Sequence, residues 1–66
     1  MIRYTPLWQT MSERKFSTYT LRVKHGMSNS TVQRLKKNLP VTTSTLDDLC
    51  KLLDCELSDI AKFVRE

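Results

Sequence analysis

The sequence predicts a small all-α domain of five short helices, because helix start and stop signals recur along its length and no stretch alternates as a strand would. Only one Gly and two Pro occur in 66 residues, and 27% of the residues are charged, which is the composition of a folded globular chain. This length allows one domain, over residues 1–66. A chain so short buries little surface, so it needs a disulfide, a metal, a partner subunit or closely packed helices.

The first helix is expected to begin near Thr5 and to run to about Arg14, with Pro6 at the first helical position, where the missing N–H costs nothing. Apolar residues at helical spacing would form its inner face and a second stripe beside it. We interpret both as core rather than as a ligand site, and their members are Tyr4, Leu7, Trp8 and Met11.

Two helices of about eight residues follow, joined by a sharp turn. The earlier one is expected to start at Ser17, its N-cap, and to end at Gly26, which can take the left-handed conformation that closes a helix. Ser28 caps the later one, which covers residues 29–37 and ends at Asn38. This pairing matches the outline of a helix-turn-helix, with motif boundaries at residues 17 and 38.

The last two helices complete the predicted fold. Thr42 or Thr43 caps the fourth, whose apolar residues recur at i, i+3, i+4 and i+7 and are expected in the core: Leu46, Leu49, Cys50 and Leu53. The fifth helix has an apolar side formed by Leu57, Ile60, Phe63 and Val64. Residues 2–4 are expected to lie extended beside Phe63 and Val64, either in the core or at an interface.

The sequence argues against membrane, secreted, metal-binding and catalytic proteins. No apolar run approaches the roughly 18 residues of a membrane span and no signal-peptide core follows the first residues, so we expect a cytoplasmic, nucleoid-associated protein. Cys50 and Cys55 should then stay unpaired, as small buried hydrophobes. With His25 as the single histidine we expect no metal site and no cofactor. No acid between Glu13 and Asp47 is placed to orient that histidine, so we expect no enzyme.

Charge is strongly polarised along the chain. Residues 1–40 carry eight Lys and Arg against one acidic residue, a net charge of +7, whereas residues 41–66 carry three against six, a net charge of −3. A basic surface collects polyanions, while evenly mixed charge only keeps a protein in solution. The first half is therefore expected to meet an acidic partner.

The helix over residues 29–37 has an outward face suited to reading DNA. At 100° per residue Val32 and Leu35 point inward with Ser28, and the opposite face carries short polar, amide and guanidinium groups. These groups read base edges in the major groove. The residues concerned are Asn29, Ser30, Gln33, Arg34 and Lys37.

The stretch over residues 17–38, STYTLRVKHGMSNSTVQRLKKN, resembles the Cro/repressor-type (XRE-like) helix-turn-helix family, in particular its short single-domain bacterial and phage members. The most specific matching residues stand in ungapped register: Leu21, Gly26, Met27, Ser28, Ser30, Thr31, Val32 and Leu35. Pro40, Val41 and the Leu-rich fourth helix follow as in the family. The resemblance implies a five-helix, lambda-repressor-like domain whose third helix lies in the major groove, usually as a homodimer on a palindromic operator.

The resemblance also implies which residues touch DNA. Base contacts in the family fall on the first, second and sixth residues of the recognition helix, with the fifth a close candidate, and these correspond to Asn29, Ser30, Arg34 and Gln33. Phosphate contacts would come from Ser17, Thr18, Ser28, Lys36, Lys37 and Asn38. Arg22 stands where the family commonly has Ala, and it is expected to lie along the third helix with its head toward solvent or phosphate. His25 stands where the family commonly has an apolar residue, and we expect a half-buried packing role rather than a pH switch.

Other interpretations stay open at this point. The basic residues at the end of the third helix could form a solvated face, and Asn29 could only support the helix start. Trp8 and Tyr19 could stack single-stranded bases, although such a platform needs several exposed rings. A protein-interaction adaptor or antitoxin-like module could use the same fold and bind its partner through the acidic second half.

We therefore predict a transcriptional regulator, acting as a repressor, that binds double-stranded DNA sequence-specifically as a homodimer. One recognition helix covers few base pairs, so two copies about 34 Å apart would discriminate sequences better. The interface is expected in the C-terminal part, on Leu57, Ile60, Phe63 and Val64. Alternatively, these side chains close the core of the monomer.

Overall fold

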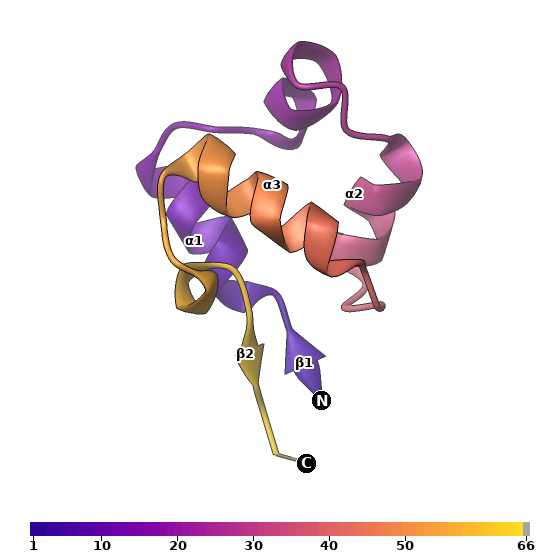
Figure 1. Cartoon of the computed structure of the whole chain (residues 1–66), viewed down its shortest axis with the longest axis vertical. Helices are drawn as coiled ribbons and strands as arrows, with labels where there is room; N and C mark the ends of the chain where they lie inside the picture. The colour runs from indigo at the N-terminus through magenta and orange to yellow at the C-terminus, as the bar shows by residue number, and fades with distance from the viewer. Residues whose placement is uncertain (66) are drawn as a thin grey trace.

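The structure, a computed structural model, describes residues 1–65 and is mostly helical (Figure 1). In chain order its elements are β1 (Ile2–Arg3), α1 (Thr5–Glu13), η1 (Thr20–Lys24), α2 (Asn29–Lys36), α3 (Thr43–Leu53), η2 (Leu57–Asp59) and β2 (Lys62–Phe63). α3 crosses the middle of the molecule, and η1 lies at the end opposite the two strands and both termini (Figure 1). The helical class is confirmed, but the described residues hold four helices and one 3-10 turn instead of five helices.

The core gathers apolar side chains from all four helices and from the segment after α3. Leu49 and Leu53, on the inner side of α3, are 0% and 2% exposed, and Leu46 and Cys50 are half-buried beside them. The apolar stripes expected on α1 are confirmed as core, with Trp8 half-buried against the cluster. Burying a leucine fully stabilises the fold by about 2 kcal/mol. The buried apolar residues are Tyr4, Leu7, Met11, Leu21, Val32, Leu35, Leu49, Leu53 and Ile60.

Two helix starts are capped by the side chains that the sequence indicates. Ser28 accepts a hydrogen bond from the Thr31 N–H at 3.2 Å, and Thr42 accepts one from the Thr45 N–H at 3.2 Å. Each cap satisfies one of the free N–H groups in the first helical turn and contributes about 1 kcal/mol. The start of α2, where the motif places its recognition helix, is therefore set by a local contact.

Tyr4 ties the start of α1 to the loop that follows α2. Its backbone N–H donates to Asn38 Oδ1 at 3.0 Å, and its hydroxyl donates to the Leu39 carbonyl at 2.9 Å. Asn38 has a φ of 57°, a left-handed conformation that asparagine tolerates, and this turns the chain away from α2 as expected. These contacts hold the exit of α2 against the core.

The helix predicted over residues 17–26 is shorter than expected, and most of it is wound more widely than an α-helix. Ser17 does cap it, accepting from the Thr20 N–H at 3.2 Å, but residues 20–24 form a π-helix. The wide winding continues into the turn, where the Met27 N–H donates to the Leu21 carbonyl, six residues back, at 3.0 Å. Gly26, at φ 71°, then reverses the chain as expected.

The prediction of a fifth helix is wrong beyond its first turn. Glu56 and Asp59 form a capping box around the 3-10 turn η2, and Ile60 then enters the core with 0% exposure. Past that point the chain is extended, because residues 62–64 find backbone partners at the other end of the sequence. Phe63 and the neighbouring Val64 are also residue types that suit a strand better than a helix.

The extended N-terminal segment pairs with the C-terminal one, as the sequence indicates. β1 and β2 are antiparallel, with Ile2 opposite Phe63. Met1 and Val64 exchange two further hydrogen bonds of 2.8 Å, which join the two ends of the described chain. The prediction that the domain contains no strand is therefore wrong, because these two segments form a two-stranded sheet.

Both cysteines are free thiols at the edge of the core. Cys50 and Cys55 are half-buried, which is less than expected. Burial raises the pKa of the Cys55 thiol, so the thiol is protonated at neutral pH. Over residues 1–65, none of the helices is both long and apolar enough to span a membrane.

Candidate nucleic-acid interface

α2 has one buried face and one exposed face, divided as the helical spacing predicts. Val32 and Leu35 are 1% and 0% exposed and fix the helix to the core. On the other side Ser30, Arg34 and Lys37 are exposed, and Gln33 is half-buried at the boundary. The exposed face offers hydroxyl, guanidinium and ammonium groups to a partner of acidic character.

The N-terminal end of α2 carries a contact between the two helices of the motif. Arg22 Nη1 of η1 donates to Asn29 Oδ1 at 3.0 Å, and both side chains are exposed. The guanidinium of Arg22 therefore lies beside the first residue of α2. Sequence reasoning missed this contact, because the two residues stand seven apart in different helices and no periodicity links them.

Arg34 leans toward the loop after α2. Its Nη1 donates to the Pro40 carbonyl at 3.4 Å, a long hydrogen bond between exposed groups. Because that contact is weak and the side chain is exposed, the guanidinium is free to exchange the carbonyl for another acceptor. Its remaining donors form the planar fork that suits guanine or phosphate.

The residues expected at phosphates differ in accessibility. Ser17, Ser28, Lys36 and Lys37 are exposed, and Thr18 is half-buried at the start of the first motif helix. Asn38 is half-buried, and its Oδ1 is occupied by the Tyr4 N–H, so only its Nδ2 donor is available to a phosphate.

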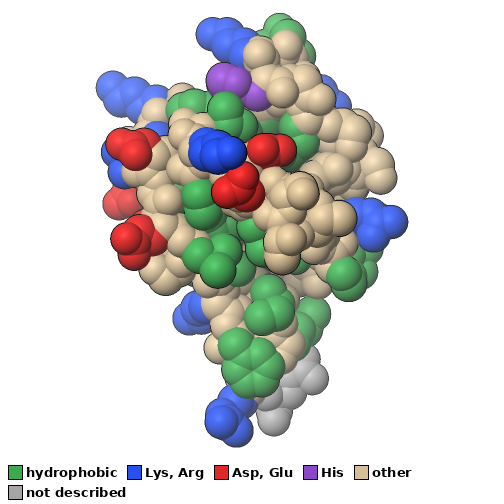
Figure 2. All heavy atoms as spheres, in the orientation of Figure 1, with side chains coloured by type: hydrophobic (Ala, Val, Ile, Leu, Met, Phe, Trp, Pro, Cys, Tyr) green, Lys and Arg blue, Asp and Glu red, His purple; other side chains and the backbone are tan. Residues whose placement is uncertain are grey.

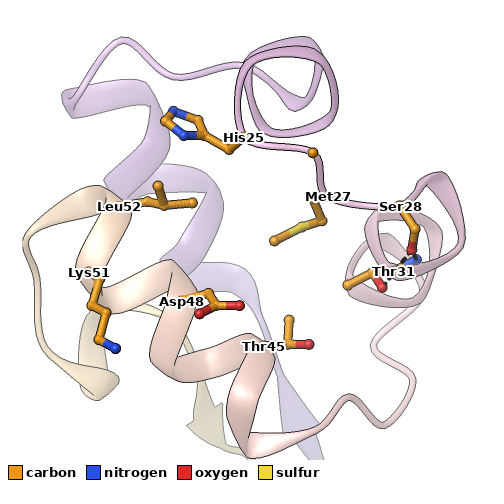
Figure 3. A pocket seen from close by; sticks show the side chains of 9 residues that line it. His25, Met27, Ser28, Thr31, Thr45, Asp48, Lys51 and Leu52 are labelled. Atoms are coloured by element: carbon orange, nitrogen blue, oxygen red, sulfur yellow. Dashed lines mark hydrogen bonds between the residues drawn. The ribbon is translucent and has the colours of Figure 1, made fainter.

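An open cleft of about 480 Å³ lies between the turn of the motif and α3 (Figure 3). Met27 points into it from the turn, and Thr45 and Asp48 face it from α3 (Figure 3). His25 lies at its rim and is exposed, so the half-buried position expected for it is wrong. Its ring stacks on Phe16 instead, with ring centroids 5.8 Å apart.

The aromatic residues weighed for base stacking do not form a platform. Trp8 packs against the core, whereas Tyr19 is 61% exposed on the first motif helix. Stacking of single strands needs several such rings along one groove. The two rings are in different environments and do not form such a groove together.

Acidic side chains cluster on α3 and the segment after it, on the face shown in Figure 2. Lys51 lies among them and pairs with Asp47 at 3.0 Å, and this hydrogen bond raises the pKa of Lys51. Within residues 1–65, no group of three or more His, Cys, Asp or Glu side chains could hold a metal ion. The basic residues of the motif thus occupy different elements from the acidic ones.

Comparisons with known proteins agree with this geometry. The sequence matches the Cro/C1-type HTH (helix-turn-helix) DNA-binding domain family over residues 6–66. The structure is similar to the crystal structure of the transcriptional regulator VanUg, with a TM-score of 0.89 and 32% sequence identity over 98% of this chain and 87% of that one. No curated protein matches the sequence. With the capped helix, its buried and exposed faces and the turn at Gly26 in place, the chain belongs to the Cro/C1-type helix-turn-helix DNA-binding domain family.

Proposed function

We propose that this protein is a transcriptional repressor that binds a palindromic duplex operator as a homodimer, with α2 in the major groove. The exposed polar face of α2 carries the proposal. That helix is held to the core by Val32 and Leu35, and its outward residues are free to approach base edges.

The contacts divide into base reading and backbone positioning. We assign base reading to the outward residues of α2, which are Asn29, Ser30, Gln33 and Arg34. Backbone contacts come from residues that surround this face, with Asn38 contributing through Nδ2 only: Ser17, Thr18, Arg22, Ser28, Lys36, Lys37 and Asn38. Gln33 is half-buried, so its contribution depends on the reach of its amide.

The homodimer brings two recognition helices to one face of the duplex. Leu57 and Phe63 are 56% and 65% exposed, and Val64 is half-buried. Leu57 and Phe63 line an open apolar groove of about 600 Å³, together with Met1, Ile2 and Leu46. Apolar side chains gather at the lower end of the molecule in Figure 2, near β1 and β2. Ile60 is removed from the expected interface, because it is buried in the core of its own chain.

In the proposed homodimer, a second copy of this chain packs against the groove. Apart from Lys62, the described side chains that line the groove are uncharged and mostly apolar, so contact between two copies would mainly remove apolar surface from water. A twofold interface uses the same patch on both subunits, and an exposed Phe63 beside an apolar groove is self-complementary in that sense.

Selection of bound sequences from a random duplex pool tests the proposal. We expect an enriched motif with two inverted half-sites about one helical turn apart. Enrichment of no sequence would contradict DNA reading and favour the protein-interaction adaptor. A single, asymmetric half-site would contradict the dimer alone.

The repressor assignment has its own test. A selected operator is placed across the start of a reporter gene, and expression is compared with and without the protein. We expect expression to fall, because the bound dimer occupies the promoter. A rise in expression would identify an activator.

A further inference from the structure

The contact between Arg22 and Asn29 determines how the first residue of α2 is presented to DNA. Arg22 Nη1 donates to Asn29 Oδ1 at 3.0 Å across the turn of the motif. Both side chains are exposed, so they stay accessible to a duplex that approaches α2.

The polarity of this hydrogen bond fixes the orientation of the Asn29 amide. A guanidinium has donors only, so the atom that faces Arg22 must be the carbonyl oxygen of Asn29. The amide nitrogen Nδ2, with two hydrogens, is then directed away from Arg22. The Arg22–Asn29 pair therefore offers mainly donors to its surroundings, while one of the two lone pairs of Asn29 Oδ1 is already in use.

Bases differ in what they require from such a pair. Adenine is read by an asparagine that accepts from N6 and donates to N7, which needs an accessible lone pair on Oδ1. Guanine offers two acceptors, N7 and O6, to donors. Beside the guanidinium of Arg22, the N6 amino group of adenine meets a second donor that competes with it for Asn29 Oδ1, whereas the N7 and O6 acceptors of guanine meet donors only, so the pair fits guanine better than adenine.

We propose that Arg22 is a specificity-determining residue that, by holding Asn29 Oδ1, makes the Arg22–Asn29 pair select guanine over adenine in the operator. This inference rests on the proposed function, because it concerns the base that α2 reads. In addition to its proposed backbone contact, Arg22 would thus have a positioning role that acts through Asn29.

Three proteins are compared by selection from the same random duplex pool. The base pair that Asn29 reads is identified as the operator position at which Asn29→Ala loses the base preference of the wild type. We expect the wild type to prefer guanine there and Arg22→Met, which keeps the apolar stem but has no donor, to lose that preference by about tenfold and to accept adenine. Preferences at all other positions stay unchanged.

Lys24→Met is the matched control, because it removes one exposed positive charge from the same helix. Arg22→Met should weaken binding to random duplex at least as much as Lys24→Met, because Arg22 is also assigned a backbone contact, and of the two Met variants only Arg22→Met should change the base preference. Asn29→Asp keeps an acceptor for Arg22 but has no donor, so we expect it to lose the preference for guanine. Thermal unfolding of each variant checks that the exposed substitutions leave the fold intact.

The inference is overturned if Arg22→Met selects the same base at this position as the wild type, or if the wild type prefers adenine there. Either result leaves sequence-specific DNA binding standing. An absence of any selected motif with the wild type would instead contradict the proposed function itself.

Discussion

Arg34 is the residue of α2 whose chemistry most directly predicts a base contact. It is exposed, and among residues 1–65 its only hydrogen bond is the long one of 3.4 Å to the Pro40 carbonyl. A bidentate contact with guanine is worth about 1–3 kcal/mol of discrimination. Arg34→Ala should therefore cost about that much on the selected operator and relax specificity at one position, measured by titration against operator and random duplex. Equal losses on both duplexes would mean that Arg34 contacts phosphate only.

Tyr4 gives a second prediction at the scale of one atom. Its hydroxyl donates to the Leu39 carbonyl at 2.9 Å, and its side chain is 4% exposed. Tyr4→Phe should lower the free energy of unfolding by about 1 kcal/mol, because one hydrogen bond in the interior is lost. Chemical denaturation measures this loss. Tyr19→Phe is the control, since Tyr19 is 61% exposed and should show no change.

At the scale of the element, the motif depends on the backbone at Gly26. Its φ is 71°, and a Cβ added there would meet no atom within 4 Å. Any cost of Gly26→Ala is therefore backbone strain, expected at about 1 kcal/mol of unfolding free energy. Gly26→Asn should cost less, because asparagine tolerates the left-handed region better. Thermal or urea unfolding compares the two, and equal losses would contradict the strain explanation.

At the scale of the whole molecule, the separation of charge predicts a steep dependence of DNA binding on salt. The logarithm of the binding constant should fall with the logarithm of salt concentration by about 0.9 for each phosphate neutralised. Lys37→Ala should weaken binding to all duplexes alike and reduce the slope by about 1. Lys51→Ala is the control, because Lys51 is exposed on α3, pairs with Asp47 and belongs neither to the proposed DNA contacts nor to the apolar groove. A slope near zero for the wild type would contradict duplex binding.

The proposed dimer is tested by placing a charge in the apolar groove. Phe63→Asp should prevent association, because Phe63 is 65% exposed at the rim of that groove and a carboxylate there resists burial. Sedimentation of both proteins at matched concentrations, with and without operator, measures the effect. Val23→Asp replaces another exposed apolar residue, on η1, and should leave association unchanged. If wild type and Phe63→Asp are both monomeric and protect one half-site equally, the dimer is wrong.

The helical class and the starts of α2 and α3 could be predicted from the sequence alone. Caps such as Ser28 and Thr42 act on N–H groups three residues away, and the inward position of Val32 and Leu35 follows from helical periodicity. These are local effects, so the residues that cause them stand close together in the chain. The exposed face of α2, and with it most of the candidate site, could be predicted for the same reason.

The course of the chain after α3 and the hydrogen bonds of the site depend on contacts between distant segments, so they could not be predicted from the sequence. The apolar side chain of Ile60 is compatible with a longer helix and also with a single turn followed by a strand. Which of the two forms depends on strand pairing between residues about 60 apart in the sequence, such as Ile2 and Phe63. The engagement of Asn38 by Tyr4 and of Asn29 by Arg22 likewise depends on which elements come together. A hydrogen bond between side chains on different elements leaves no periodic trace in the sequence, because it is set by the packing of those elements and not by the local order of residues.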